Sequence, residues 1–435
     1  MGLPPGSHGR PEPPTGPGTA PFTALGPVRR RARSLVDSPG PRQYPRISVR
    51  PERHRVSLIS EAVPQAGSAP RPRMAASRTR LESLTGLRWF AALLIFCYHF
   101  SYEQYGAGTA KHLRALKDAT FAGPSAVSFF FILSGFVLAW SARPGDPVPG
   151  FWRRRFARIY PSHLVTFGIA ALMLVWMGKR LETGLALSNL TLTQSWVPND
   201  EDRWFAYNGV SWSLGCEFFF YLCFPLLISA MRRLPLAGLW AVVGLGNLFV
   251  LLHPLTTGFF LRTAGWEEKF TLYMFPPVRL AEFVIGIALA LLVKKGAWRG
   301  PGLVASVALS VGAVLALAHL MPEKFHWVAV TVVPFTLTVA AAARADVRGE
   351  ESPFRNRFVV YLGEVSFAFY LLHEMVIFST SHFLRLHHVT VPLAVHATLV
   401  MAISLGGAVL LHEYVEKPCV KWLGPRAERI RRSGR

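Results

Sequence analysis

Residues 84–100, LTGLRWFAALLIFCYHF, place one arginine and one histidine within an otherwise apolar run. Arg88 and His99 are eleven residues apart, which is about three helical turns, so both side chains share one helix face about 16 Å apart along the axis. Ionisable side chains are costly inside a membrane, where they usually mark a reaction site or a substrate pathway. The stretch therefore predicts a membrane helix that carries a cation near its start and a buried base further along.

The composition supports a membrane protein. Hydrophobic residues make up 51% of the 435 residues, more than most soluble chains of this length contain. Apolar runs of about 20 residues recur along the chain, and we place them at residues 86–102, 123–141, 159–178, 210–231, 234–252, 270–293, 301–319, 326–343, 360–380 and 391–412. The predicted fold is an all-α, polytopic bundle of about ten transmembrane helices.

The distribution of Lys and Arg predicts the orientation of this bundle. With ten spans and a cytoplasmic amino terminus, the cytoplasmic loops and tail hold 21 basic residues and the outer loops hold ten. Cytoplasmic loops normally carry such an excess. We therefore expect both termini to be cytoplasmic.

The two ends of the chain differ from the apolar part. Residues 1–80 contain 15 prolines, 14 arginines, no lysine and four acidic residues, without apolar periodicity, so we expect a disordered basic tail. Met74 is an alternative start to Met1. Residues 424–435 form a second basic tail, which leaves 81–423 as the membrane domain. We interpret the formal net charge of +22 as a signal that orients the chain in the membrane and contacts anionic lipid head groups, rather than as a sign of nucleic-acid binding.

The four cysteines predict neither a disulfide framework nor a metal site. Three of them lie in predicted spans and one, Cys419, follows the last predicted span, and no CxxC or close His/Cys cluster occurs. We expect no bound metal and no permanently bound cofactor.

Six stretches, in order, resemble the acyltransferase-3 family of integral-membrane O-acyltransferases. Residues 84–100 resemble its first helix, with Arg or Lys, ten residues and then His. The others are FFFILSGFVL at 129–138, RRRFARIYP at 153–161, WSLGCEFFFYLCFP at 212–225, LGEVSFAFYLLH at 362–373 and VEKP at 415–418. The resemblance covers residues 81–423. Thr85 stands where many members carry Asp, so no acidic role transfers to that position.

The resemblance implies transfer of an acyl group, commonly acetyl, from acyl-CoA to a hydroxyl, often on a carbohydrate. The expected acceptor is a carbohydrate or a glycosylated small molecule such as a macrolide sugar, and the expected location is a bacterial plasma membrane. The sequence does not define the acceptor, the length of the acyl chain, the oligomeric state, or whether the acyl group first rests on the enzyme.

Acyl-CoA has a polyanionic nucleotide end, which requires clustered guanidinium groups at the cytoplasmic face. Arg155 and Arg158 share one face at the start of the third span, and Arg88 starts the first span on the same side. The alternative is that they are positive-inside anchors, which we prefer for Arg153 and Arg154. For Arg88, Arg155 and Arg158 we predict acyl-CoA binding.

Histidine suits the base that removes the proton of the acceptor hydroxyl, so we predict that His99 is catalytic. Glu217 is expected to lie at about the same membrane depth as His99, so we predict that its carboxylate orients the imidazole. Ser213 is predicted to take a supporting position on the substrate side. The alternatives are a histidine bonded to helix backbone and a protonated glutamate bonded within the bundle. His373 either lines the acceptor side or bonds to helix backbone.

Other intramembrane positions have simpler interpretations. Arg279 and Glu282, at i and i+3, predict a structural ion pair. Ser134 and Gly135 are expected to be close-packing positions. A transporter or lipid flippase is the main alternative function, because intramembrane charges also mark substrate paths.

Overall fold

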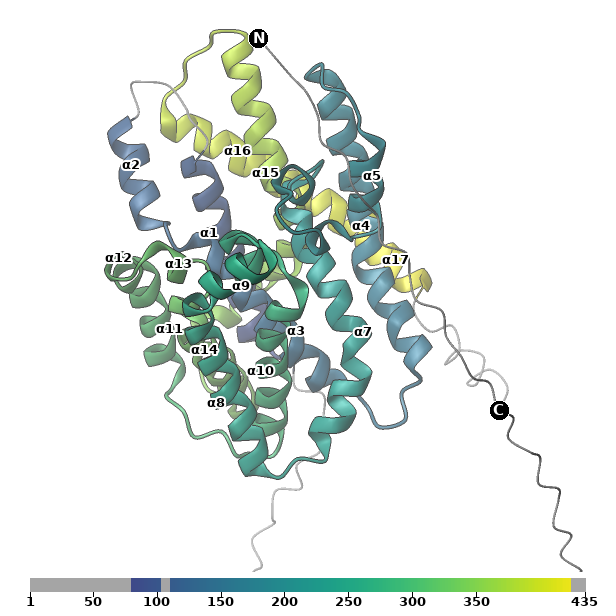
Figure 1. The fold of residues 1–435 in the computed structure, drawn as a ribbon, viewed down its shortest axis with the longest axis vertical. Helices are drawn as coiled ribbons and strands as arrows, with labels where there is room; N and C mark the ends of the chain where they lie inside the picture. The colour runs from purple at the N-terminus through teal and green to yellow at the C-terminus, as the bar shows by residue number, and fades with distance from the viewer. Residues whose placement is uncertain (1–79, 103–109, 424–435) are drawn as a thin grey trace, which may run out of the picture. The chain divides into compact units, whose positions relative to one another are not determined.

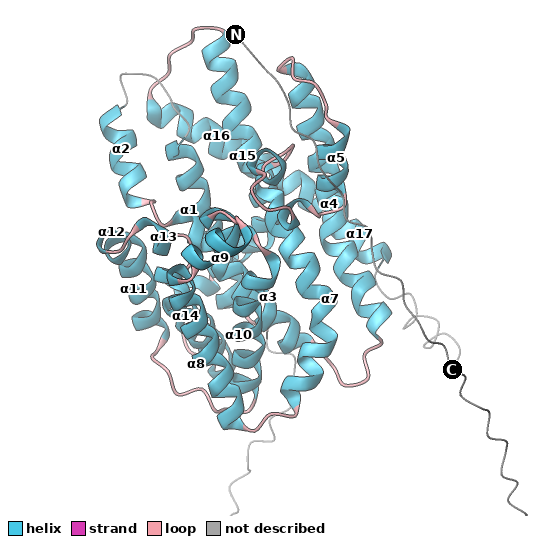
Figure 2. Cartoon of the chain, in the orientation of Figure 1, coloured by secondary structure: helices cyan, strands magenta, loops and turns pink. Residues whose placement is uncertain are grey.

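The computed structural model describes residues 80–102 and 110–423, and we consider only this part of the chain. Within these ranges the secondary structure is helical and contains no strand, as Figure 2 shows. The predicted tails, residues 1–80 and 424–435, lie outside the described residues except for Arg80. The all-α fold class is confirmed.

The helices follow one another through the described residues with short connections (Figure 1). The long or intermediate ones are α1 Glu82–Tyr102, α2 Ala110–Ala119, α3 Ala126–Ser141, α4 Val148–Trp176, α7 Trp212–Arg232, α8 Leu236–Leu252, α10 Pro276–Lys294, α11 Leu303–Gly312, α14 Ala329–Arg348, α15 Arg357–Leu386 and α16 Leu393–Leu411. The short ones are α5 Thr183–Leu190, α6 Glu201–Trp204, α9 Thr257–Ala264, α12 Ala318–Leu320, α13 Glu323–His326 and α17 Lys417–Leu423. Single turns include η2 Gly123–Ser125, η3 Gln194–Trp196, η4 Gly209–Ser211, η5 His253–Leu255, η6 Phe270–Met274, η7 Ala313–Leu317, η8 Pro353–Arg355 and η9 His412–Glu416.

Nine helical segments of the described chain are long and apolar enough to cross a membrane. They correspond to nine of the ten predicted spans. The remaining predicted span, 301–319, contains a shorter apolar helix, Leu303–Ala316, in which α11 continues into the π-helical turn η7. The structure thus agrees with a polytopic helical bundle, although one predicted span is shorter than the sequence suggested.

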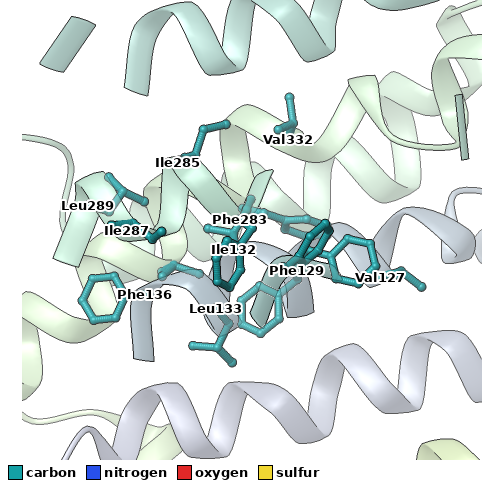
Figure 3. Close-up of a cluster of buried hydrophobic side chains, with 14 of the residues drawn as sticks. Val127, Phe129, Ile132, Leu133, Phe136, Phe283, Ile285, Ile287, Leu289 and Val332 are labelled. Atoms are coloured by element: carbon teal, nitrogen blue, oxygen red, sulfur yellow. The ribbon is translucent and has the colours of Figure 1, made fainter. Parts of the chain in front are cut away.

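Helices α3 and α10 form the closest packing in the core. Gly135 of α3 and Gly286 of α10 face each other's helix, and a Cβ at either position would overlap a backbone carbonyl, that of Phe283 or Ile132. Small residues permit this backbone approach between membrane helices. Buried aromatic and aliphatic side chains of both helices surround the contact (Figure 3). The expected close-packing role of Gly135 is confirmed.

Helices α1 and α15 form a second close pair, although they are far apart in sequence (Figure 1). A Cβ at Gly363 of α15 would overlap the carbonyl oxygen of Thr85 of α1. The rings of Trp89 and Phe369 also meet edge to face, with centroids 5.1 Å apart. This packing fixes the position of α15 relative to the helix that carries Arg88 and His99.

The connection between α4 and α7 folds into a buried polar layer rather than an open loop. The side-chain amide of Asn189 donates to the carbonyl of Ala206 and to the hydroxyl of Ser211, both at 2.9 Å. Gln194 donates to the same hydroxyl at 3.2 Å. These hydrogen bonds hold the connection against the start of α7, the helix that carries Ser213 and Glu217.

Candidate active site

A cavity of about 450 Å³ lies between α1, α3, α4, α7 and α15, with Val420 of α17 at its edge. Apolar side chains of α3 form much of its wall. Its polar and charged lining residues are Arg88, Ser134, Arg154, Arg155, Arg158, Ser213, Glu217, Tyr221, Ser366 and Tyr370. We call this space the arginine cavity, because four of its ten polar lining residues are arginines.

Arg88 of α1 and Glu217 of α7 face this cavity from opposite helices. Both are half-buried, and they lie close enough for their charges to interact. The carboxylate of Glu217 also accepts hydrogen bonds from Ser134 and Tyr221. Glu217 therefore provides a counter-charge for Arg88 at membrane depth, where an unpaired charge would be costly.

Arg155 and Arg158 lie one turn apart on α4 and enter the cavity from its other side. Arg158 forms an ion pair with Glu416 of η9, whose side chain is fully buried. The ring of His412 lies 3.1 Å from the same carboxylate, measured from Nδ1 to Oε2. Nε of Arg155 is buried and has no hydrogen-bond partner among the described residues. A π-helical turn, a feature common at functional sites, places Glu416 here.

Three guanidinium groups thus meet two carboxylates around one cavity, namely Arg88, Arg155 and Arg158 with Glu217 and Glu416. Arg154 is paired separately with Asp146. The charge balance within this cluster is positive, and a guanidinium can donate to phosphate oxygens through several N–H groups. The cluster is therefore suited to binding an anion.

The opposite end of the cavity is neutral and aromatic. The hydroxyl groups of Ser213 and Tyr370 lie 2.9 Å apart, and Tyr370 also donates to the carbonyl of Val210 at 3.1 Å. The ring of Phe130 lies 6.2 Å from that of Tyr370. Together these side chains close the cavity against α15.

His373 follows Tyr370 by three residues on α15, less than one turn further along the helix. Its Nε2 lies 2.8 Å from Nδ1 of His99, and the two rings are nearly parallel with centroids 5.0 Å apart. Nδ1 of His373 lies 2.7 Å from the carbonyl oxygen of Tyr370. His373 is fully buried, whereas His99 is half-buried. We call His99 and His373 the histidine pair.

The structure brings most of the predicted site residues to one place. Arg88, Arg155, Arg158, Glu217 and Ser213 all line the arginine cavity. Whether they bind acyl-CoA or take part in catalysis stays a prediction.

The expected contact between Glu217 and His99 is replaced by another one. Nδ1 of His99 is bonded to His373, whereas Glu217 is bonded to Ser134 and Tyr221. A residue count gives the position of a side chain along a helix axis but not the rotation or tilt of the helix, so a similar depth does not bring two side chains into contact. One of the two alternatives for His373, a bond to helix backbone, is confirmed by its contact with the carbonyl of Tyr370. The other nitrogen of the ring contacts His99.

Several residues of the site had not been singled out as functional. Tyr221 lies one turn after Glu217 on the same helix face, a spacing that the sequence does show. Glu416 belongs to the VEKP stretch, but its pairing with Arg158 joins segments 258 positions apart. Ser134, which the sequence predicts to be a packing position, also bonds to Glu217.

Arg279 and Glu282 form the expected ion pair outside the cavity. Their side chains approach to 3.1 Å and are both almost fully buried. Arg279 also donates to the hydroxyl of Ser128 at 3.2 Å. No group of three or more His, Cys, Asp or Glu residues that could hold a metal ion occurs in the described parts of the chain.

Comparison with known proteins gives a consistent result. Residues 81–413 match the model of the acyltransferase domain that defines the acyltransferase-3 family. The chain is 42% identical over 369 residues to acyltransferase MdmB of Streptomyces mycarofaciens, a match that covers 80% of this chain and 93% of MdmB. It is 25% identical over 198 residues to peptidoglycan O-acetyltransferase OatA of Listeria monocytogenes, covering 40% of this chain and 28% of OatA.

A third relative is nodulation protein 10 of Rhizobium leguminosarum, which is 27% identical over 186 residues, or 38% of this chain and 50% of that protein. No solved structure matches the chain significantly. The family model spans most of the membrane bundle, including the histidine pair and every lining residue of the arginine cavity except Val420. The chain therefore belongs to the acyltransferase-3 family and is a multi-pass membrane acyltransferase.

Proposed function

We propose that this acyltransferase moves an acyl group, acetyl in the simplest case, from cytoplasmic acyl-CoA to a hydroxyl of a carbohydrate or glycosylated small-molecule acceptor. The observation that carries the proposal is a cavity with clustered arginines at one end, closed at the other by Tyr370, which neighbours the histidine pair on α15. The names of two relatives, a peptidoglycan O-acetyltransferase and its putative counterpart in Bacillus subtilis, support transfer to a hydroxyl.

The arginines fit the nucleotide end of the donor. Arg88, Arg155 and Arg158 offer guanidinium groups to the phosphates, and Arg154 lies near them at the edge of the same cavity. The cavity volume of about 450 Å³ lies in the lower part of the usual range for ligand pockets. This favours a slender pantetheine arm inside the cavity and the bulkier nucleotide at its mouth.

The mixed wall of the cavity fits such an arm. Apolar side chains of α3, including Phe130 and Phe131, can pack against its methylene groups. Ser213 and Tyr370 offer hydroxyl groups near the far end. The thioester would then lie beside Tyr370, which precedes His373 by three residues on α15.

His99 is suited to general-base catalysis because it is half-buried and held in place by a second ring. In direct transfer, its imidazole takes the proton of the acceptor hydroxyl while that oxygen attacks the thioester carbonyl. The C–S bond of the tetrahedral intermediate then breaks, and the departing thiolate takes the proton back from the imidazole. The products are the acyl ester and free CoA thiol.

Purified protein in sealed vesicles tests this function. We expect acetyl-CoA and an acceptor glycoside to yield free thiol and an acceptor that is heavier by one acetyl group. Thiol release should depend on the acceptor, and His99→Ala should abolish it. Movement of the acceptor across the vesicle membrane without thiol release or acetylation would contradict the proposal and favour a transporter.

A further inference from the structure

We propose that His373 is a positioning residue that fixes His99 in the tautomer whose Nε2 is the free base. The inference rests on the proposed role of His99 and deepens it. His373 need not touch either substrate in this role, because it acts through the ring of His99.

The position of the proton on His373 follows from its neighbours. Its Nδ1 faces two backbone carbonyl oxygens, that of Tyr370 at 2.7 Å and that of Phe369 at 3.3 Å. A carbonyl oxygen only accepts hydrogen bonds, so Nδ1 must carry the proton. A neutral imidazole has one N–H group, which leaves Nε2 of His373 as an acceptor.

The tautomer of His99 follows in turn. Nε2 of His373 can only accept, and it lies 2.8 Å from Nδ1 of His99. Nδ1 of His99 must therefore donate, and its lone pair stays on Nε2. This is the ring nitrogen that can take a proton from an acceptor hydroxyl, as in groupings where a third residue orients the base.

Packing makes His373 suited to this role. Its side chain is fully buried, and its ring stacks on Phe369 with centroids 5.8 Å apart. The side-chain amide of Asn208 holds the α15 backbone nearby, because it donates to the carbonyl of Leu371 at 2.9 Å. His99 is half-buried, so the orienting ring is enclosed while the reacting ring remains accessible.

The hydrogen bond also has a consequence during the reaction. When Nε2 of His99 takes the proton, the ring becomes a cation and its Nδ1–H donates more strongly to His373. The neutral ring of His373 thus stabilises the imidazolium without a second buried charge. No proton needs to leave the pair before the thiolate takes it back.

Three substitutions of His373 test this role. In His373→Gln, the side-chain amide can occupy the position of the imidazole Nε2, so its oxygen can accept the hydrogen bond from Nδ1 of His99. Asparagine reaches only the place of Nδ1, and His373→Leu has no acceptor. We expect kcat to fall about 100-fold or more in the Asn and Leu variants, since loss of the orienting group costs about 10⁴-fold in a serine protease triad. His373→Gln should stay within about tenfold of the wild type, and the KM for acyl-CoA should change little in all three.

A matched control is His163 of α4, which is also fully buried and bonded to a backbone carbonyl, with Nε2 3.0 Å from the oxygen of Asn189. His163→Leu should lower the thermal stability but leave kcat unchanged.

Wild-type kcat in folded His373→Asn and His373→Leu would overturn the inference, as would an equal loss in His373→Gln and His373→Asn. If the Leu variant does not fold, the Gln and Asn pair still decides the question. Full turnover by His99→Ala would instead overturn the proposed function itself.

Discussion

The arginine cavity and the histidine pair lie next to each other but are built by opposite means. Charged side chains of α1, α4 and α7 line the cavity, several of them half-buried, and Glu416 of η9 pairs with one of them, Arg158. The histidine pair consists of two rings joined by one hydrogen bond and enclosed by aromatic side chains. In the proposed function this difference separates two tasks: the cavity binds the donor with adaptable side chains, and the histidine pair holds the reacting groups in a fixed geometry.

Physical properties of the side chains support this division. Arginine has a long flexible stem, so a guanidinium cluster can adjust to phosphates in more than one arrangement. Proton transfer instead requires reacting atoms to be aligned within a few tenths of an ångström, which short stacked rings provide. Substitutions in the cavity should therefore act mainly on KM, and those in the histidine pair mainly on kcat.

The largest effect should come from His99→Ala. General-base catalysis contributes about 10²–10⁴-fold to a rate, so we expect kcat to fall by about 1,000-fold while the Kd for acyl-CoA changes little. Single-turnover transfer and equilibrium binding of acyl-CoA measure the two quantities separately. Loss of acyl-CoA binding in this variant would mean that the two regions are not distinct.

Arg155→Ala should produce the second largest effect. A hydrogen bond to a charged group contributes about 1.5–3 kcal/mol, so the KM for acyl-CoA should rise about 10–100-fold. We expect kcat to stay within about threefold, since this residue lies far from the reacting atoms in our proposal. Initial rates over a range of acyl-CoA concentrations measure both constants.

Arg153→Ala is the matched control for this prediction, because Arg153 is on the same helix but exposed and outside the cavity lining. It should leave the KM unchanged. An equal rise in KM for both variants would indicate a general effect of charge at the membrane surface.

Glu416→Gln should affect stability more than turnover. Its buried carboxylate is paired with Arg158, which joins η9 to α4. Loss of one partner of a buried pair costs about 3–5 kcal/mol, but Arg158 is partly exposed, so we expect about 1–2 kcal/mol. A lower Tm in detergent would show this effect.

Glu413→Gln is the matched control, because Glu413 lies on the same turn and is paired with Lys417 at the surface. Its Tm should equal that of the wild type. Equal Tm values for both variants would show that the pair of Arg158 and Glu416 does not hold η9 against α4.

The sequence predicted the cavity better than the histidine pair, for a physical reason. Arg155 and Arg158 are three residues apart on one helix, so their shared face follows from helix geometry alone. His99 and His373 are 274 positions apart, and their contact depends on how α1 and α15 pack. The spacing of residues along the chain does not predict how these helices pack. For this reason the sequence predicts Glu217, and not His373, as the partner of His99.

The fold shows the same limit. Apolar length predicted the spans well, because every backbone group within a membrane must be satisfied inside its helix. The buried polar layer of Asn189, Gln194 and Ser211 was not predicted, since its polar, irregular sequence has no period. Hydrogen bonds between distant groups determine that segment.

Ser213→Ala should give the smallest effect and sharpens the boundary between the two regions. Ser213 lines the cavity, and its hydroxyl lies beside that of Tyr370, three residues before His373. Tyr370 keeps its bond to the carbonyl of Val210 in the variant, so the ring should not move. The loss of one neutral hydrogen bond costs about 1 kcal/mol, so we expect kcat and KM to change less than about fivefold. A fall in kcat comparable to that of His373→Leu would show that Ser213 belongs with the histidine pair, and that the reacting end begins within the cavity.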